Sequence, residues 1–509
     1  MSERRAVALI AAVWLLSTVI WLRPGVTKPD GAAYVSWLPS TWIDHDLLLF
    51  RSWSRFGMLK GGIVQSEGLT ANGHIANHWS AGSAVVWYPA FLLGDAMRTA
   101  RFPRDGISLP YNVAAVAASA FCGLIALLAG YFAARRFFAR DAALIATITT
   151  WFGTPLLWYS EREALMAHAA GAAMCALVVL ASLRDDGSSR AMFVAGLAAG
   201  LAFSIRPQSA TFLAVPLILC GWRRWAFAAA GFVAGALPQI VVLRVLYGNP
   251  FAVKQAWHSF ERFWAWEPLL SWYHGAIAWA PLLLVGIAGF AFLERRLRAA
   301  AMAMFVAQWL LNATADRFFW AGSSFGQRRF DNCTIFFLLG AAALFARLPR
   351  WASIAVAAAA SLWTMALFFA ASVLDLNRYY LPSELLEAAV RAPKTIGVLI
   401  SVPAGYKAIV LAVAFAVFVL YAALAVVVSK WPALAGAALC IAASVWFAVC
   451  GANDAAHMRA WEGVIAANRA VEPYNGAIHD YDANVVAEEW YLRKSGRVSA
   501  PAPAFPPRP

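Results

Sequence analysis

Charged residues are scarce in this sequence. Only 13% of its 509 residues are Asp, Glu, Lys or Arg, whereas soluble domains contain about 25%. Hydrophobic residues make up 62%, and many of them stand in runs of about 20, the length that crosses a bilayer as a helix. This composition excludes a water-soluble enzyme. It predicts an all-α polytopic membrane protein that has the lipid bilayer as a partner.

Cysteines and acidic residues are also few. The six cysteines form no CxxC pair and no metal-ligand spacing, which argues against a disulfide framework or a structural zinc site. The 27 Asp and Glu residues are outnumbered by 41 Lys and Arg residues. These cations cluster between apolar runs, so their role in orienting the protein in the membrane explains them better than binding to nucleic acid. No nucleic-acid partner is expected.

The apolar runs predict about thirteen transmembrane helices. Basic residues follow every second run, and the positive-inside rule therefore places the N-terminus in the cytoplasm and the C-terminus outside. The run from Ala81 to Met97 would break this alternation if it crossed the membrane. Because it contains Pro89, Gly94 and Asp95, we expect it to lie along the outer membrane surface instead.

These assignments predict a transmembrane domain over residues 1–450. Within it, residues 23–109 form a large first outside loop with juxtamembrane helices. Residues 451–509 form a polar outside tail whose Pro-rich end is expected to be disordered. The long polar segments lie outside and the cytoplasmic loops are short, so chemistry is expected at the outer face.

The first outside loop contains several candidate site residues. Asp30 follows the first span closely, where a carboxylate near hydrocarbon is a candidate catalytic base, although it also suits a helix start. Asp44 and Asp46 form a DxD-like pair that is a candidate site for a divalent cation or for sugar hydroxyls, or is simply solvated. His78 adds a polar group beside the aromatic face of Trp79.

Further candidates lie near the outer ends of later runs. His168 is an ionisable group inside an apolar run, and Glu161 precedes it. Arg206, Arg328 and Arg329 lie where the positive-inside rule predicts few cations, which favours an anionic ligand, although Arg206 also suits a snorkelling role. The last candidates are Trp264, His274 and Trp320. Their rings could pack against a sugar or belong to an interfacial aromatic belt.

The order of these features resembles the GT-C superfamily of membrane glycosyltransferases. The similar branch includes protein O-mannosyltransferases and the bacterial aminoarabinose transferase of lipid A. The resemblance covers most of the chain. It rests on these segments and their order: Asp30-Gly31 through Asp44-His45-Asp46, Ala133-Ala134-Arg135-Arg136-Phe137-Phe138, Gly153-Thr154-Pro155 through His168, the stretch from Gly196 to Pro207, and Trp320-Ala321-Gly322 through Arg328.

The resemblance implies an inverting enzyme in the bacterial cytoplasmic membrane with a periplasmic active site. It would move a sugar from a polyprenyl-phosphate-linked donor to an acceptor hydroxyl of a glycan, lipid or protein. By this resemblance, Asp30 matches the catalytic carboxylate of the family, and Arg206 matches a position that many relatives fill with Lys or Arg. The relatives often have a second aspartate early in the fourth span, and the nearest match to it in this sequence is His168. A polyprenyl-lipid flippase or transporter and an O-antigen ligase or polymerase type of enzyme remain as alternatives. The sequence shows no repeated halves, and its long loop comes first.

Overall fold

The computed structural model describes residues 2–26, 29–60, 63–64, 68–184, 188–252, 263–314, 319–392 and 404–470. Most of the chain in these parts is helical. One short antiparallel pair, β1 (Leu59–Lys60) with β2 (Ile63–Val64), lies in the first loop. Helices dominate because a chain in lipid must satisfy its backbone N–H and C=O groups within its own segment. The expected all-α fold is therefore confirmed.

Six helices in the described part of the chain are long and apolar enough to cross a membrane. They are α1 (Glu3–Trp21), α6 (Leu109–Arg135), α12 (Trp225–Tyr247), α18 (Arg350–Ala371), α20 (Ala404–Lys430) and α21 (Pro432–Met458) with its continuation. Shorter apolar helices include α9 (His168–Ser182), α10 (Ser189–Ile205), α11 (Ala214–Cys220) and α15 (Leu282–Gly289). The count of about thirteen spans stays a prediction.

The remaining elements connect or cover these helices. In the first loop they are α2 (Pro29–Val35), α3 (Trp37–Pro39), the π-helix η1 (Ser40–Asp44), α4 (Phe50–Arg55) and α5 (Gly82–Ala96). Those between α6 and α12 are α7 (Arg140–Gly153), α8 (Leu156–Glu161), η2 (Ala164–Met166), η3 (Pro207–Leu213) and η4 (Trp222–Arg224). Those after α12 are α13 (Glu267–Leu270), α14 (Ala276–Trp279), η6 (Phe290–Phe292), α16 (Arg295–Thr314), η7 (Arg328–Cys333), α17 (Thr334–Phe345), α19 (Pro382–Arg391) and η9 (Arg459–Trp461).

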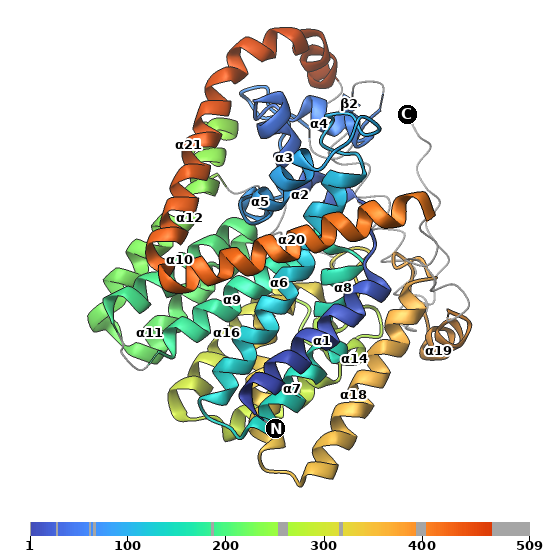
Figure 1. Cartoon of the computed structure of the whole chain (residues 1–509), viewed down its shortest axis with the longest axis vertical. Coiled ribbons are helices and arrows are strands. Elements are labelled where there is room, and N and C mark those ends of the chain that lie inside the picture. The colour runs from blue at the N-terminus through green and yellow to red at the C-terminus, as the bar shows by residue number, and fades with distance from the viewer. Residues whose placement is uncertain are drawn as a thin grey trace.

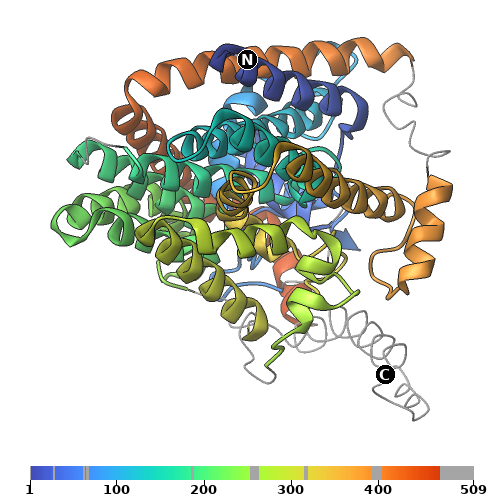
Figure 2. The ribbon, with the colours of Figure 1, turned by 90° about the horizontal axis from the view of Figure 1, so that it is seen from below.

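Helix α6 forms the centre of the bundle. It contacts α1, α7, α9, α17 and α20, and 89% of its most apolar window is buried. Its alanine-rich sequence allows this close packing, because small side chains let helices approach one another. On one side of the bundle α1 and α20 lie next to each other (Figure 2), with Trp14 edge-on to Phe418 at 4.9 Å.

Helices α10 and α12 are in direct backbone contact. A Cβ atom on Gly196 would lie 1.8 Å from the carbonyl oxygen of Ala228, and one on Gly235 would lie 2.2 Å from that of Leu197. Both helices carry glycines four residues apart, an arrangement that brings membrane helices into backbone contact. The contact fixes α10, whose C-terminal end leads directly into Arg206.

Helix α5 lies across the ends of the long helices. A Cβ atom on Gly82, at its start, would lie 2.2 Å from the backbone of Ser204 at the end of α10. One on Gly94, near its end, would lie 2.9 Å from the carbonyl of Pro110 at the start of α6. Figure 1 shows α5 beside α2 and α3, which it contacts. The two ends of α5 thus contact the end of α10 and the start of α6, so α5 lies along the face of the bundle where these helices end.

We predict that this face is the outer one. Single cysteines at positions 104 and 138, in a Cys-depleted background, should differ in their reaction with a membrane-impermeant reagent applied to intact cells. Arg104→Cys should be labelled because the predicted orientation puts residue 104 outside, and Phe138→Cys should be protected because that orientation puts the neighbouring Arg cluster in the cytoplasm. The reverse pattern would overturn the assigned orientation.

Helix α21 continues through the expected boundary at residue 450. It runs to Met458, η9 follows, and the chain stays helical to residue 470. This C-terminal extension curves over the first loop near α4 (Figure 1), and Phe50 stacks on Trp461 at 5.1 Å. Its polar residues find partners in the first loop, which explains why the helix does not end with the apolar run. Residues 471–509 of the expected tail lie outside the described residues.

Candidate functional site

Asp30 and Arg328 form an ion pair between the first loop and η7. Asp30 occupies the first turn of α2, where the partial positive charge of a helix N-terminus favours a carboxylate. Nη1 of Arg328 lies 3.1 Å from Oδ2 of Asp30, and the Asp30 side chain is 29% exposed. One carboxylate oxygen is therefore anchored while the group remains accessible.

The 3₁₀ helix η7, which contains Arg328, also carries the carboxyl group of Asp331 toward the bundle. Arg328 and Asp331 are three residues apart in η7, and side chains at this spacing project from the same side of a 3₁₀ helix. Oδ2 of Asp331 lies 3.0 Å from Nδ1 of His168, with both side chains at most 5% exposed. Helix η7 thus links the accessible pair to a buried one.

His168 is held from several directions. It begins α9 directly after Ala167, whose φ of 62° turns the chain from η2 into the helix. Its ring stacks on Tyr159 at 4.2 Å, and the Tyr159 hydroxyl accepts a hydrogen bond of 2.9 Å from the backbone N–H of Phe325. Nη1 of Arg206 approaches the imidazole at 2.7 Å. Segments from three parts of the sequence therefore fix this ring.

Tyr34 completes the polar side of α2. It lies one turn after Asp30 and is 8% exposed. Burial raises the pKa of Tyr34, and the charges of Arg206, Asp30 and Arg328 act on it in opposing directions. The phenol therefore stays neutral between the two arginines and the carboxylate.

Four of the residues that the sequence singled out meet in this cluster: Asp30, His168, Arg206 and Arg328. Sequence reasoning missed Tyr34, Tyr159 and Asp331. A signal for Asp331 was present, because it is a carboxylate at the start of an apolar run, where ionisable groups are costly. The two tyrosines gave no such signal.

Two other predicted residues lie near the cluster with partners of their own. The carbonyl of Arg329 accepts a hydrogen bond of 2.8 Å from Gln208 Nε2, and the Arg329 side chain is buried. Glu161 is also buried and accepts a hydrogen bond of 2.7 Å from Thr18 of α1. Burial raises the pKa of Glu161 to about 8, partly offset by that hydrogen bond. Glu161 thus pairs with α1.

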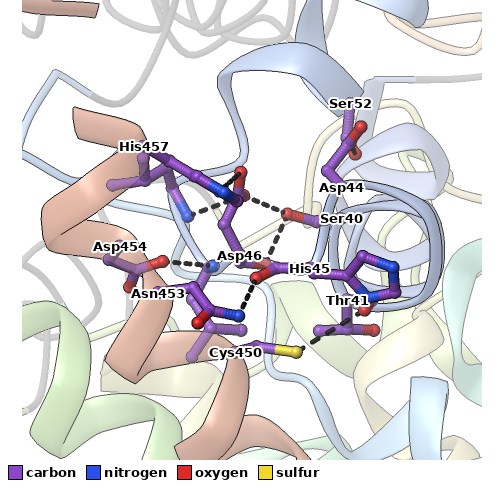
Figure 3. Close-up of polar contacts among 12 residues, drawn as sticks. Ser40, Thr41, Asp44, His45, Asp46, Ser52, Cys450, Asn453, Asp454 and His457 are labelled. Carbon is purple, nitrogen blue, oxygen red and sulfur yellow. Dashed lines mark hydrogen bonds and ion pairs between the residues drawn. The ribbon is translucent and has the colours of Figure 1, made fainter. Parts of the chain in front are cut away.

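Asp44 and Asp46 belong to a separate network at the C-terminal extension of α21, shown in Figure 3. Both oxygens of Asp44 accept from Arg55, at 2.6 and 2.8 Å. Asp46 contacts Ser40 at 3.1 Å and His457 at 3.2 Å. Burial, followed by the charge of Asp44, raises the pKa of Asp46.

A further residue of α21, Asp454, also hydrogen-bonds to the first loop. Asp454 of α21 accepts from the backbone N–H of Leu47 at 2.8 Å and contacts His74 at 2.9 Å. Among the described residues, no three His, Cys, Asp or Glu side chains are arranged to hold a metal ion. The divalent cation expected at Asp44 and Asp46 stays a prediction.

The remaining candidates lie among aromatic side chains. Trp264 and Trp320 belong to a buried cluster with Tyr273, Phe319 and Tyr379. Within the same region His274 Nε2 donates to the carbonyl of Leu376 at 2.8 Å. These rings are packed against one another in a closed cluster.

His78 lies elsewhere, against the segment that carries Asp30. Its ring stacks on Trp79 at 3.7 Å. The neighbouring Asn77 donates a hydrogen bond of 3.1 Å to the carbonyl of Ala33 in α2. The segment that contains His78 is therefore attached to the helix that begins with Asp30.

Comparison with known proteins gives two structural neighbours. No family model and no curated protein matches the chain. ArnT from Cupriavidus metallidurans bound to undecaprenyl phosphate is 17% identical, with a TM-score of 0.44, covering 88% of this chain and 76% of ArnT. The mycobacterial arabinofuranosyltransferase AftD is 16% identical, with a TM-score of 0.42, covering 77% of this chain and 28% of AftD.

Proposed function

We propose that this membrane protein is an inverting glycosyltransferase. It moves a sugar from a polyprenyl-phosphate-linked donor to an acceptor hydroxyl of a cell-envelope glycan, lipid or protein. The observation that carries the proposal is the accessible carboxylate of Asp30 beside Arg328, in one cluster with Arg206. The donor belongs to the same lipid class as the undecaprenyl phosphate in the ArnT structure.

The cluster provides both groups that such a transfer needs. Asp30 takes the proton of the acceptor hydroxyl as its oxygen attacks the anomeric carbon. The bond between that carbon and the donor's phosphate oxygen breaks at the same time, and the anomeric configuration inverts. Arg328 and Arg206 stabilise the negative charge that develops on the departing polyprenyl phosphate.

Other candidates have no part in this reaction. Asp44 and Asp46 are engaged with Arg55 and with Ser40 and His457, so we give them no role in the transfer. We place the reacting cluster at the outer face of the bacterial cytoplasmic membrane, on the side where α2 and α5 cover the bundle.

Reconstitution of the purified protein in liposomes tests this function. A panel of polyprenyl-phosphate-linked hexoses and pentoses, labelled in the sugar, should yield free polyprenyl phosphate and labelled acceptor when cell-envelope extract is added. Asp30→Asn is the control, in which the release should slow by about 100-fold or more. Movement of intact donor between the leaflets without cleavage would show a flippase instead, and elongation of a lipid-linked glycan would show a polymerase.

A further inference from the structure

Arg162 is a buried cation that no group of the described chain closes. It follows α8 directly and is 6% exposed. Its Nε is buried without a hydrogen-bond partner, and its two terminal nitrogens have no partner among the residues that the structure describes. A buried charge is costly unless it is paired and hydrogen-bonded. The donors of Arg162 are therefore available to an anion.

The neighbouring carboxylates are engaged elsewhere. Glu161 turns toward α1, where it accepts a hydrogen bond of 2.7 Å from Thr18. The negative charge of Glu163 acts on Arg162 but also on Arg328. Among the described residues, neither glutamate forms an ion pair with Arg162. Adjacent charges in the sequence thus do not neutralise one another here.

Arg23 brings a second cation to the same place. It follows α1 and is exposed, and its backbone N–H donates to the carbonyl of Glu161 at 2.9 Å. Burial lowers the pKa of Arg162 to about 10, the charge of Arg23 lowers it further, and Glu163 offsets part of this effect. The two arginines therefore repel each other, and an anion bound between them would relieve this repulsion.

Aromatic rings surround this pair at the end of α1. The guanidinium carbon of Arg162 lies 5.9 Å from the ring centroid of Trp158. Trp158 is edge-on to Phe368 of α18 at 5.3 Å, and Phe368 lies 5.4 Å from Trp21, the last residue of α1. Tryptophans beside cations are typical of the boundary between membrane and water. The anion that fits this position is the headgroup of a lipid.

The pair of arginines also lies next to α2, the helix that carries the proposed base. A Cβ atom on Gly31 would lie 3.5 Å from the Cβ of Leu165, three residues after Arg162. The cation that acts on Arg162 is Arg23, and the arginines of the Asp30 cluster make no such contribution. The two cationic sites are therefore separate, although both adjoin α2.

We propose that Arg162 and Arg23 form a second anion site, which binds the phosphate group of a lipid headgroup. The planar donors of Arg162 can contact two phosphate oxygens at once. One further step rests on the proposed function: the lipid held here is the acceptor, whose hydroxyl reaches Asp30.

Binding of a fluorescent phosphatidic acid to the purified protein in phosphatidylcholine nanodiscs tests the site. Undecaprenyl phosphate is present at saturation, so that the Asp30 cluster is occupied and the remaining binding reports Arg162. Arg162→Gln should weaken this binding about 10-fold or more, because charged hydrogen bonds to the phosphate are lost. The matching diacylglycerol, which lacks the phosphate, should not compete. Binding of undecaprenyl phosphate itself should be equal in the variant and the parent protein.

Thermal stability separates ligand binding from a structural role. Arg162→Gln removes a buried cation that has no carboxylate partner, so stability without the phosphatidic acid should be unchanged or higher. Arg55→Gln is the matched control, because it leaves the buried carboxylate of Asp44 without its arginine. This control should lower stability and leave the binding of phosphatidic acid unchanged.

Sugar transfer tests the acceptor assignment. The phosphate-bearing lipids of the cell envelope serve as acceptors, with the polyprenyl-linked donor that the parent protein cleaves. Arg162→Gln should raise the KM for these lipids about 10-fold and leave the maximal rate within about 3-fold, because the site binds the acceptor without touching the reacting atoms. An unchanged KM would overturn the acceptor assignment.

Three results would overturn the lipid site: unchanged binding of phosphatidic acid in Arg162→Gln, its complete displacement from the parent protein by undecaprenyl phosphate, or equally tight binding of inorganic phosphate. The last result would show a site for a free anion. Failure of the proposed function gives a different pattern. If the parent protein binds phosphatidic acid through Arg162 but cleaves no polyprenyl-linked sugar, the lipid site holds, and the transferase assignment falls together with the acceptor role.

Discussion

Replacement of Asp30 by Asn should lower the rate of sugar transfer by about 100-fold or more, because the loss of a general base costs at least that much. The amide is close in size to the carboxylate but cannot take the proton of the acceptor hydroxyl. The protein should stay folded, because the amide oxygen of Asn can still accept a hydrogen bond from Arg328. Single-turnover rates with the labelled donor, at saturating acceptor, measure the effect.

The matched control for Asp30→Asn is Asp375→Asn. Asp375 also pairs with an arginine, Arg378, at 3.5 Å, and both side chains are more than half exposed. It should transfer sugar at the normal rate. Near-normal transfer by Asp30→Asn would move the base to another group, and Asp331 would then be the remaining carboxylate of the cluster to test.

Replacement of Gly196 by Leu should destabilise the protein strongly. The first side-chain atom would lie 1.8 Å from the carbonyl oxygen of Ala228, so α10 and α12 must separate. Overpacking of a well-packed core costs about 1–3 kcal/mol and occasionally more, and a contact between two helix backbones leaves little room to adjust. We expect a loss at or above the top of that range, seen as a lower temperature of thermal inactivation and a lower yield of monodisperse protein.

Gly405→Leu serves as the control for this helix contact. Gly405 lies near the start of α20, and no atom lies within 4 Å of a Cβ placed there. This variant should match the parent protein in stability. Equal stability of Gly196→Leu and Gly405→Leu would show that α10 and α12 do not meet along these glycines in the membrane.

The helical membrane fold follows from the sequence alone. Long apolar runs with few charges form helices in lipid, because each backbone N–H and C=O group must then be hydrogen-bonded within its own segment. The same reasoning placed Asp30, His168, Arg206 and Arg328 among the candidates, since ionisable groups near the hydrocarbon region are costly and need a reason to be there. It also put Asp44, Asp46 and Trp264 among the candidates, and the structure places them outside the cluster around Asp30.

Only the tertiary structure decided which of these residues meet. Asp30 and Arg328 are about 300 positions apart in the sequence, and their pairing depends on how α2 and η7 pack against the same bundle end. The proximity of Asp331 to His168 depends on a 3₁₀ turn that puts Asp331 on the same side as Arg328. Apolar periodicity specifies that a helix forms and which residues it buries, whereas contacts between distant polar side chains arise from the packing of many helices at once. The sequence therefore determined that this chain folds in a lipid bilayer. The packing of its helices determined which of its few charged residues share a site.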